Sequence, residues 1–384
     1  MKSNYKQLGQ FIRQVDERNT DGKEDNLLGV SVQKMFIPSI ANTVGTDFSK
    51  YKVVKKGQFT YIPDTSRRGD KIGIALLEDY EEGLVSNVYT VFEIIDQHQL
   101  IPEYLMLWFS RPEFDRYARY KSHGSVREIF DWDEMCKVEL PVPPYEEQLE
   151  IVKDCRTISE RIALKQKIND NLVASLNAVY KELFANADIK FETAPLQKLC
   201  SKIGSGATPK GGKTAYFDEG ISLIRSTNVF DFRFEYSELA HINNNQANAL
   251  SNVIVEPNDV LFNITGVSVA RCCMVPNNVL PARVNQHVMI VRPIKGEFMS
   301  YYIMFTLCAP DNKAKLLGIG QSGSTREAIN KQELESFEIP VPDDAILSKF
   351  GYAAKQVYAH ISDNIREIHD LEELKTVLLA ELSR

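Results

Sequence analysis

The chain contains an internal duplication, and this feature restricts its fold more than any other. Residues 123–143 read HGSVREIFDWDEMCKVELPVP and residues 322–342 read SGSTREAINKQELESFEIPVP, and nine of the 21 aligned positions are identical. The identities include Gly124/Gly323 and Arg127/Arg326, together with the closing Pro-Val-Pro. A long helical pattern follows each copy. We therefore expect two similar domains, each leading into a long helix.

Both helical patterns place apolar residues with a strict 4,3 spacing, which is typical of a coiled-coil seam. One asparagine interrupts each seam, and such a residue costs stability but can fix the register of the two helices. Because the first helix must lead the chain to the second domain, we expect an antiparallel pair; two independent surface helices are the alternative. The expected seam residues are Ile158, Ile162, Asn169, Leu172 and Leu176, with Ile361, Asn364, Ile368, Leu371 and Leu378.

The regions that precede the helices contain short strand patterns and turns. Strands are expected at 60–62, 72–75 and 89–94 in the first copy and at 260–264, 268–272 and 288–291 in the second, with apolar-faced helices at 102–110 and 298–307. The expected fold class is α+β: two similar globular domains of mixed, strand-rich α/β structure, separated by two long antiparallel coiled-coil helices with a pseudo-twofold internal repeat. The expected division is 1–146 for the first domain, 147–186 for the central helix, 187–343 for the second domain and 344–384 for the last helix.

Composition argues against a membrane protein and against a metal site. No apolar run approaches the roughly 18 residues that a membrane span needs, and residues 1–5 open no signal-peptide pattern, so a cytoplasmic location is expected. The six cysteines and six histidines form no CxxC pair and no cluster at metal-ligand spacing. Buried free thiols and no metal are expected.

The net charge of −7 is unfavourable for binding a polyanion. Residues 1–150 carry 19 Lys+Arg against 25 Asp+Glu, whereas residues 189–342 carry 15 against 14. Any nucleic-acid-binding face must therefore be a local basic patch, and an acidic protein of this kind would gain from a second subunit that helps to hold DNA.

No catalytic residues are expected. Residues 207–214, ATPKGGKT, resemble a phosphate-binding loop, but the residues after Lys213 are broken too soon by Gly220 to form the required helix. Val142-Pro143-Pro144-Tyr145 lacks the amide or carboxylate that amino-methyltransferases use at its first position, and no glycine-rich loop is present for S-adenosylmethionine. Asp70 and Lys71 are adjacent, which does not suit a metal-dependent nuclease.

Other segments suit DNA recognition, because arginine can contact guanine, asparagine and glutamine can contact adenine, and lysines and hydroxyls suit phosphate. In the first domain the candidates lie between two expected strands and in the repeated loop: Thr65, Ser66, Arg67, Arg68, Lys71 and Arg127. In the second domain they are Ser205, Thr208, Lys210, Lys213, Arg225, Asn228, Asn263, Thr265, Asn285, Gln286, His287 and Arg326. Residues shared by both copies suit the fold or phosphate, so the differences between copies are expected to carry sequence choice.

Over its whole length the chain resembles the specificity subunit of type I restriction–modification systems. The similarity rests on residues 204–210 (GSGATPK), 263–266 (NITG) with 284–287 (VNQH), 65–71 (TSRRGDK) and 143–148 (PPYEEQ). The second helix departs from this pattern at its start, where residues 342–346 read PDDAI.

This resemblance implies a non-catalytic recognition subunit in which each domain reads one half of a split double-stranded DNA target and the helices set the gap. Its implied partners are two methyltransferase (modification) subunits and restriction/translocase subunits. S-adenosylmethionine, ATP and Mg are expected in those partners, and no cofactor is expected in this chain. Two alternatives stay open: a structural coiled-coil adaptor without DNA specificity, and a nucleotide-binding enzyme that uses the Lys213 loop.

Overall fold

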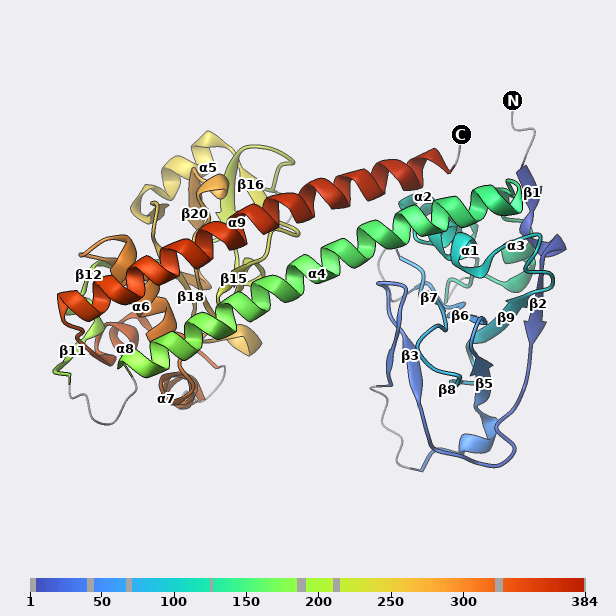
Figure 1. The fold of residues 1–384 in the computed structure, drawn as a ribbon, viewed down its shortest axis with the longest axis horizontal. Coiled ribbons are helices and arrows are strands. Elements are labelled where there is room, and N and C mark those ends of the chain that lie inside the picture. Colours follow the sequence, from blue (N-terminus) through green and yellow to red (C-terminus); the bar gives the residue numbers. More distant parts are fainter. Residues whose placement is uncertain are drawn as a thin grey trace. The chain divides into compact units, whose positions relative to one another are not determined.

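A computed structural model of the chain describes residues 5–39, 45–66, 71–124, 127–184, 191–209, 215–321 and 327–382 (Figure 1). By their contacts the residues divide into two compact units. The N-terminal unit consists of Met1–Lys165 with Arg366–Arg384, and the C-terminal unit consists of Gln166–Ile365. Each long helix thus contributes residues to both units, whereas the four-part division expected from the sequence stays a prediction.

The N-terminal unit is built on one antiparallel four-stranded sheet and three short helices. Its strands lie in the order β2 (Ile12–Val15), β9 (Thr90–Ile94), β6 (Phe59–Tyr61) and β7 (Ile74–Leu76). Three two-stranded pairs accompany it: β1 (Tyr5–Gln7) with β10 (Glu139–Pro141), β3 (Leu28–Val30) with β4 (Phe36–Pro38), and β5 (Lys52–Lys55) with β8 (Glu82–Val85). The helices are α1 (Pro102–Phe109), α2 (Pro112–Lys121) and α3 (Trp132–Cys136). Helices α1 and α2 both begin at a proline, whose fixed φ and missing N–H suit the first helical turn.

The C-terminal unit repeats this order of elements. Its first sheet is β12 (Cys200–Ser205), β21 (Val288–Pro293), β18 (Val260–Asn263) and β19 (Cys272–Met274), and β11 (Thr193–Pro195) pairs with β22 (Glu338–Pro340). The helices α6 (Glu297–Cys308), α7 (Pro310–Gln321) and α8 (Lys331–Glu335) follow in sequence. This unit also has a second sheet, β16 (Ala240–Ile242), β13 (Ile221–Ile224), β20 (Ala282–Val284) and β17 (Ile254–Val255), with the hairpin β14 (Val229–Phe230)–β15 (Arg233–Phe234) and helix α5 (Asn244–Ala249).

The duplication extends to single hydrogen bonds. In the N-terminal unit the hydroxyl of Tyr104 on α1 donates to the carbonyl oxygen of Pro141 at 3.1 Å. In the C-terminal unit the hydroxyl of Tyr302 on α6 donates to the carbonyl oxygen of Pro340 at 2.7 Å. Both carbonyls belong to the repeated Pro-Val-Pro, so the same tyrosine fastens the first helix after the sheet to the last strand in each unit. The two similar mixed α/β domains expected from the duplication are confirmed.

One expected strand is wrong. Residues 268–272 do not form a strand up to Cys272, because Gly266–Ser268 form a 3₁₀ turn and Ala270 has a φ of +64°. That left-handed backbone cannot continue a strand, so β19 begins only at Cys272. The strand was expected because Val269 favours a strand, but its buried side chain instead anchors the turn in the core.

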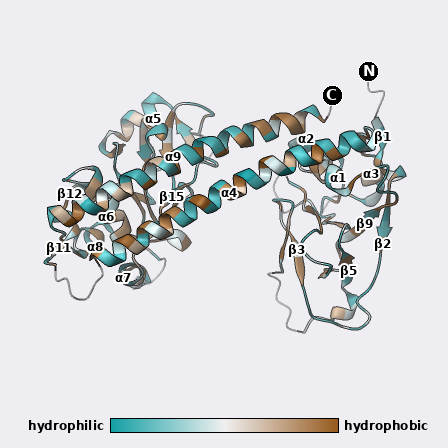
Figure 2. Ribbon diagram, in the orientation of Figure 1, coloured by the Kyte–Doolittle hydropathy of each residue, from teal (hydrophilic) through white to brown (hydrophobic). Residues whose placement is uncertain are grey.

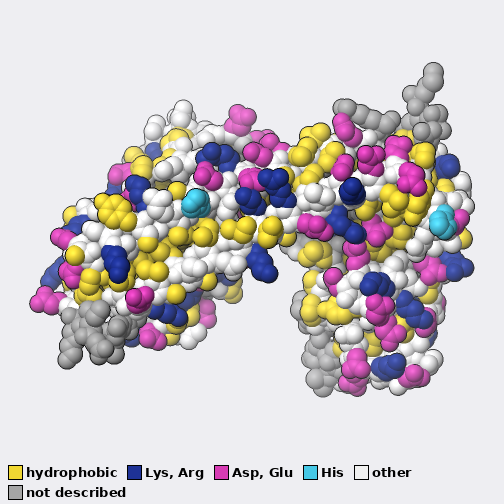
Figure 3. All heavy atoms as spheres, in the orientation of Figure 1, with side chains coloured by type: hydrophobic (Ala, Val, Ile, Leu, Met, Phe, Trp, Pro, Cys, Tyr) yellow, Lys and Arg dark blue, Asp and Glu magenta, His cyan; other side chains and the backbone are white. Residues whose placement is uncertain are grey.

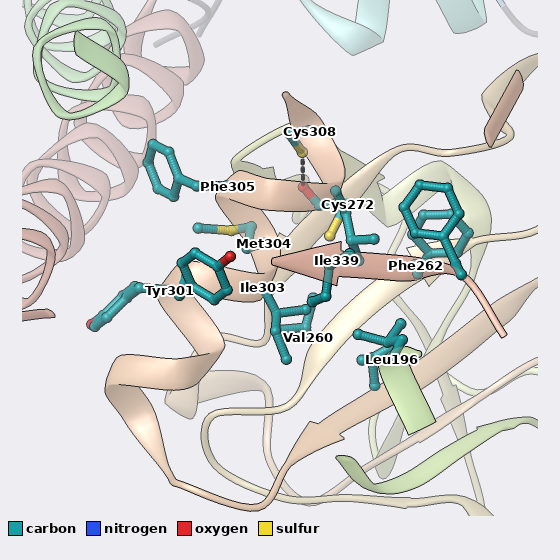
Figure 4. Packing of buried hydrophobic residues seen from close by; sticks show 14 of the residues in the cluster. Leu196, Val260, Phe262, Cys272, Tyr301, Ile303, Met304, Phe305, Cys308 and Ile339 are labelled. Atoms are coloured by element: carbon teal, nitrogen blue, oxygen red, sulfur yellow. Dashed lines mark hydrogen bonds between the residues drawn. The ribbon is translucent and has the colours of Figure 1, made fainter. Parts of the chain in front are cut away.

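The core of the C-terminal unit surrounds α6, which is buried on all sides from Met299 to Cys308. Figure 4 shows Ile303 of α6 on the side of Val260 of β18 and Ile339 of β22, whereas Phe305 points away from them. The ring of Phe305 lies 5.3 Å from that of Phe350. The thiol of Cys308 donates to the carbonyl oxygen of Cys272 at 3.6 Å. All six cysteines are free and five of them are buried, as the sequence indicated.

The two long helices are α4 (Tyr145–Phe184) and α9 (Asp344–Glu381), and they pack against each other within each unit. In the C-terminal unit Asn364 Nδ2 donates to Asn169 Oδ1 at 2.8 Å, and the rings of Tyr180 and Phe350 lie 5.8 Å apart. In the N-terminal unit Lys375 Nζ donates to Ser159 Oγ at 2.8 Å. In the same unit Lys165 pairs with Glu367 at 2.7 Å. In each unit the position on α9 falls as the position on α4 rises, so the helices are antiparallel there.

The helix surfaces carry the mixed pattern of apolar and polar residues that a seam requires (Figure 2). All ten residues expected in the seam are buried or half-buried in the structure. The two helices begin at matching places despite their different sequences. At the start of α9, Asp343 Oδ1 accepts a hydrogen bond from the amide of Ile346 and caps the helix. At the start of α4 it is Gln148 that is buried, and its side chain binds the backbone of Ile101 and Pro143. Among the described residues, no helix is both long and apolar enough to cross a membrane.

Candidate nucleic-acid interface

In the C-terminal unit, five strands end or begin at one place. Ser205 at the end of β12 pairs with Met289, and Asn263 at the end of β18 pairs with Val288. In the second sheet the last residues of β13 and β20 pair in parallel, and the amide of Asn285 donates to the carbonyl oxygen of Ile224. The amide of Gly206 in turn donates to the carbonyl oxygen of Asn285 at 3.1 Å. The polar segments that the sequence singled out therefore meet at one end of two adjoining sheets.

Three asparagines of this group point inward. Asn263 Nδ2 donates to the carbonyl oxygens of Ser226 and Val229 at 2.9 and 3.2 Å, and its Oδ1 has no hydrogen-bond partner within the described part of the chain. Asn228 is fully buried and donates to the carbonyl oxygen of Glu235 at 2.9 Å. Asn285 Oδ1 accepts from the amide of His287 at 3.0 Å. These hydrogen bonds hold the loops of the candidate interface in place, and the base-contacting role expected for the three asparagines stays a prediction.

A second group faces outward. Thr265 Oγ1 lies 2.7 Å from His287 Nδ1, and Gln286 Nε2 lies 3.2 Å from His287 Nε2. Gln286 is exposed, while Thr265 and His287 are half-buried. The hydroxyl of Thr265 can donate or accept, so this contact is compatible with either tautomer of the imidazole. The exposed amide of Gln286 offers both a donor and an acceptor, which is the combination that reads adenine in the major groove.

Arg225 is held by its own unit. Its guanidinium donates to the carbonyl oxygen of Glu238 and lies over the ring of Tyr216, 5.5 Å from the ring centroid. Its side chain is only 15% exposed, and it lies 4.0 Å from the carboxylate of Glu238. The guanidinium group of Arg225 therefore stabilises the loop after β13 and is largely shielded from solvent.

The N-terminal unit places its candidates at the corresponding end of its sheet. Thr65 is buried: its amide donates to the carbonyl oxygen of Glu128 at 2.9 Å and its hydroxyl donates to Ser122 Oγ at 2.9 Å. Ser66 is bound through its amide and hydroxyl to Asp64 Oδ1. Lys71 and Arg127 are exposed. Thr65 therefore supports the fold, and among the candidates that the structure describes in this unit the two cations are exposed to a phosphate.

The repeated loop pairs with the same segment in both units. The amide of Phe130 donates to the carbonyl oxygen of Pro63 at 2.9 Å, just after β6. The amide of Ile329 donates to the carbonyl oxygen of Ile264 at 2.8 Å, just after β18. Sequence alignment found the repeat but could not find this pairing, because the partners lie more than 60 residues apart. It makes Asp64 and Thr265 equivalent positions, each in an isolated bridge with the repeated loop.

Comparison with known proteins identifies the N-terminal part. Residues 4–174 match the family described as the Type I restriction modification DNA specificity domain. This match covers somewhat less than half of the chain. For these residues it confirms the resemblance found in the sequence.

Two solved structures of similar proteins cover nearly the whole chain. The S subunit of the type I restriction-modification system from M. genitalium aligns with a TM-score of 0.56 at 12% identity, over 98% of this chain and 95% of that one. The HsdS subunit from Thermoanaerobacter tengcongensis aligns with a TM-score of 0.36 at 17% identity, over 100% of this chain and 97% of that one. The first match shows that the fold extends beyond the DNA specificity domain, through the C-terminal unit.

Sequence reasoning missed a groove of about 500 Å³ beside β12, the edge strand of its sheet. It is lined by residues 200–205 of β12 and by Asn252, Lys331 and Glu335. Lys202 and Lys331 bring two cations to it, although Lys331 lies 3.4 Å from the carboxylate of Glu335. Ser205 belongs to this groove, and Thr208 is half-buried close by in sequence. Lysines and hydroxyls in this arrangement suit a phosphate backbone.

Five predicted DNA contacts lie outside the described residues: Arg67, Arg68, Lys210, Lys213 and Arg326. The helix that a phosphate-binding loop needs after Lys213-Thr214 does not occur within residues 215–243, which the structure describes without a gap. Charged side chains of both signs are interspersed on the face drawn in Figure 3. That mixture agrees with a nearly balanced charge in residues 189–342 and with a DNA-binding patch of limited size.

Proposed function

We propose that the chain is the sequence-reading subunit of a type I restriction–modification complex, and that each unit reads one half of a split DNA target. One observation carries this proposal: both units repeat the same sheet and helix order, yet they present different side chains at the matching end. The C-terminal unit exposes Gln286 beside Thr265 and His287, whereas the N-terminal unit has Asp64 at the position of Thr265 and exposes Lys71. A common scaffold with different exposed groups is what two different half-sites require.

The long helices set the gap between the half-sites in this proposal and provide the docking surface for two modification subunits. Those subunits would carry the S-adenosylmethionine-dependent chemistry, and restriction/translocase subunits would use ATP and Mg. Residues 1–150 carry 25 acidic against 19 basic side chains, so a partner that adds positive charge around the DNA is needed for tight binding. The chain itself supplies recognition and no catalysis.

Genome-wide methylation mapping tests the proposal. A host with this chain and its modification subunits is compared with a host that lacks only this chain. We expect a split adenine-methylated motif with a fixed gap in the first host and not in the second. Identical methylation in both hosts would refute the proposal and favour a structural coiled-coil adaptor.

Replacing Gln286 with alanine is expected to relax one base pair of one half-site. A lost paired contact to a base costs about 1–3 kcal/mol of discrimination, or roughly a 5- to 160-fold change in preference. Binding selections with randomised duplexes and the assembled complex would measure this change. The half-site read by the N-terminal unit serves as the internal control, and relaxation of both half-sites would contradict the assignment.

Lengthening the helices is expected to change the gap and leave both half-sites intact. Four residues inserted in each helix, at the facing positions Asn169 and Asn364, add about 6 Å of helix, or roughly two base pairs of B-form DNA. Methylation mapping would detect the longer gap. A variant with four substitutions at the same place and no change in length is the control, and an altered half-site with an unchanged gap would refute the spacing role.

A further inference from the structure

Val267 is a fully exposed apolar side chain within the outward-facing polar group of the C-terminal unit. Its side chain is 97% exposed, the highest value among the exposed large apolar residues described. It occupies the centre of the 3₁₀ turn Gly266–Ser268 and lies two residues from Thr265, which contacts His287. Val267 therefore lies beside the cluster of Thr265, Gln286 and His287, whose polar atoms can bind the edges of bases.

The turn that carries Val267 is fixed on both sides. The amide of Gly266 donates to the carbonyl oxygen of Glu327 at 2.9 Å, and the amide of Ala270 donates to that of Asn263 at 2.8 Å. Val269 follows with a side chain only 4% exposed, which anchors the turn in the core. A β-branched side chain has few rotamers, so holding Val267 against a partner costs little conformational entropy.

We propose that Val267 reads a thymine by apolar contact with its C5 methyl group. This inference rests on the proposed function and deepens it, because it names a specificity residue that residue type alone did not suggest. The thymine methyl is the apolar group that the major groove offers, and aliphatic side chains recognise it there. Gln286 contacts the same His287 as Thr265 does, and its amide donor and acceptor supply the polar contacts to the base.

Deoxyuridine substitution tests the contact, since it removes only the C5 methyl group. Each thymine of the split target is replaced in turn by deoxyuridine, and the Kd of the assembled complex with each duplex is measured. We expect one thymine, in one half-site only, at which the substitution weakens binding by the wild-type chain about fourfold, the effect of one buried methyl group. Val267→Ala should weaken binding to the thymine duplex and should bind both duplexes equally.

Ile294→Ala is the matched control. Ile294 is also exposed, at 63%, and follows the opposite end of β21, away from His287. This variant should show the wild-type penalty for deoxyuridine. Neither substitution should change the melting temperature much, because both side chains are already in solvent.

Three results would overturn the inference: a target without thymine, a wild-type complex indifferent to deoxyuridine everywhere, or a Val267→Ala complex that keeps the wild-type penalty. Equal weakening of both duplexes by Val267→Ala, with the penalty kept, would indicate a wedge between bases instead of methyl recognition. In each of these cases selective binding of the split target persists. Loss of selective binding in the wild-type complex would instead refute the proposed function itself.

Discussion

Replacing Asp115 with alanine is expected to destabilise the N-terminal unit by about 3–5 kcal/mol, because it leaves a buried ammonium group without its partner. Lys34 Nζ lies 2.7 Å from Asp115 Oδ1, and the two side chains are only 8% and 10% exposed. The amide of Ile72 also donates to Asp115 Oδ1 at 3.1 Å, and Lys34 Nζ donates to the carbonyl oxygen of Phe109. One carboxylate thus joins the β3–β4 turn, α2 and the segment before β7.

Hydrogen–deuterium exchange of the whole chain would measure this loss locally, because two units need not unfold as one transition. The control is Glu81→Ala, which removes a partner of Lys56 at 3.0 Å in a pair whose side chains are 55% and 87% exposed. That exposed pair should contribute less than about 1 kcal/mol. Equal effects of Asp115→Ala and Glu81→Ala would contradict the prediction.

The pH dependence of stability gives a second test of the ion pair between Lys34 and Asp115. Burial lowers the pKa of Lys34 below the ordinary lysine value of 10.5, although Asp115 opposes this shift. Without Asp115 the pKa should fall further, so that the folded state binds fewer protons than the unfolded chain over a wider range below 10.5. Stability of the variant should therefore rise with pH in that range. The difference from the wild type should shrink as Lys34 loses its charge.

Replacing Gly206 with alanine is expected to cost roughly 3 kcal/mol or more in the C-terminal unit, because a methyl group there overlaps backbone. A Cβ at Gly206 would lie 1.8 Å from the carbonyl oxygen of Val284 and 3.0 Å from Cγ2 of Val253. The hydrogen bond from Gly206 to Asn285 would have to break, which separates β12 from β20 at the candidate interface. Binding selectivity for one half-site should be lost together with stability.

Gly204→Ala is the matched control, since Gly204 lies two residues earlier, on β12. A Cβ at Gly204 would meet no atom within 4 Å. Its substitution should change stability by less than about 1 kcal/mol. Hydrogen–deuterium exchange of β20 and β21, followed as the temperature rises, would compare the two variants. If the Gly206→Ala chain is as stable as the Gly204→Ala chain, the close approach of Gly206 to the carbonyl oxygen of Val284 does not matter for stability.

Sequence alone predicted the parts of the fold that repeat or that follow a simple period. The 4,3 spacing predicted α4 and α9, and the repeated segment predicted two similar domains. Expected strands at 60–62, 89–94, 260–264 and 288–291 agree closely with β6, β9, β18 and β21. The second sheet was not predicted, because its parallel pair β13–β20 joins segments about 60 residues apart that carry no local signal of their pairing.

The sequence names candidate contacts by residue type and does not give their orientation. Asn263 and Gln286 are equally plausible base contacts in a sequence, yet one is buried against backbone carbonyls and the other is exposed. Whether such a side chain is buried depends on where strands distant in the sequence end. The local sequence pattern does not contain this information. Val267 was missed for the opposite reason, since a valine in a strand-like segment is normally assigned to the core.

The last turns of α9 complete the N-terminal core, where Leu382 is only 7% exposed and Leu379 packs beside it. During translation, residues 5–165 therefore leave the ribosome well before the side chains that finish their core. Until the end of α9 has been synthesised, the lysine, glutamate and arginine side chains of α4 shield the apolar surface of this core only partly. That exposed surface can be bound by chaperones or cut by proteases. Co-translational folding of this protein is thus expected to end at the unit whose synthesis began first.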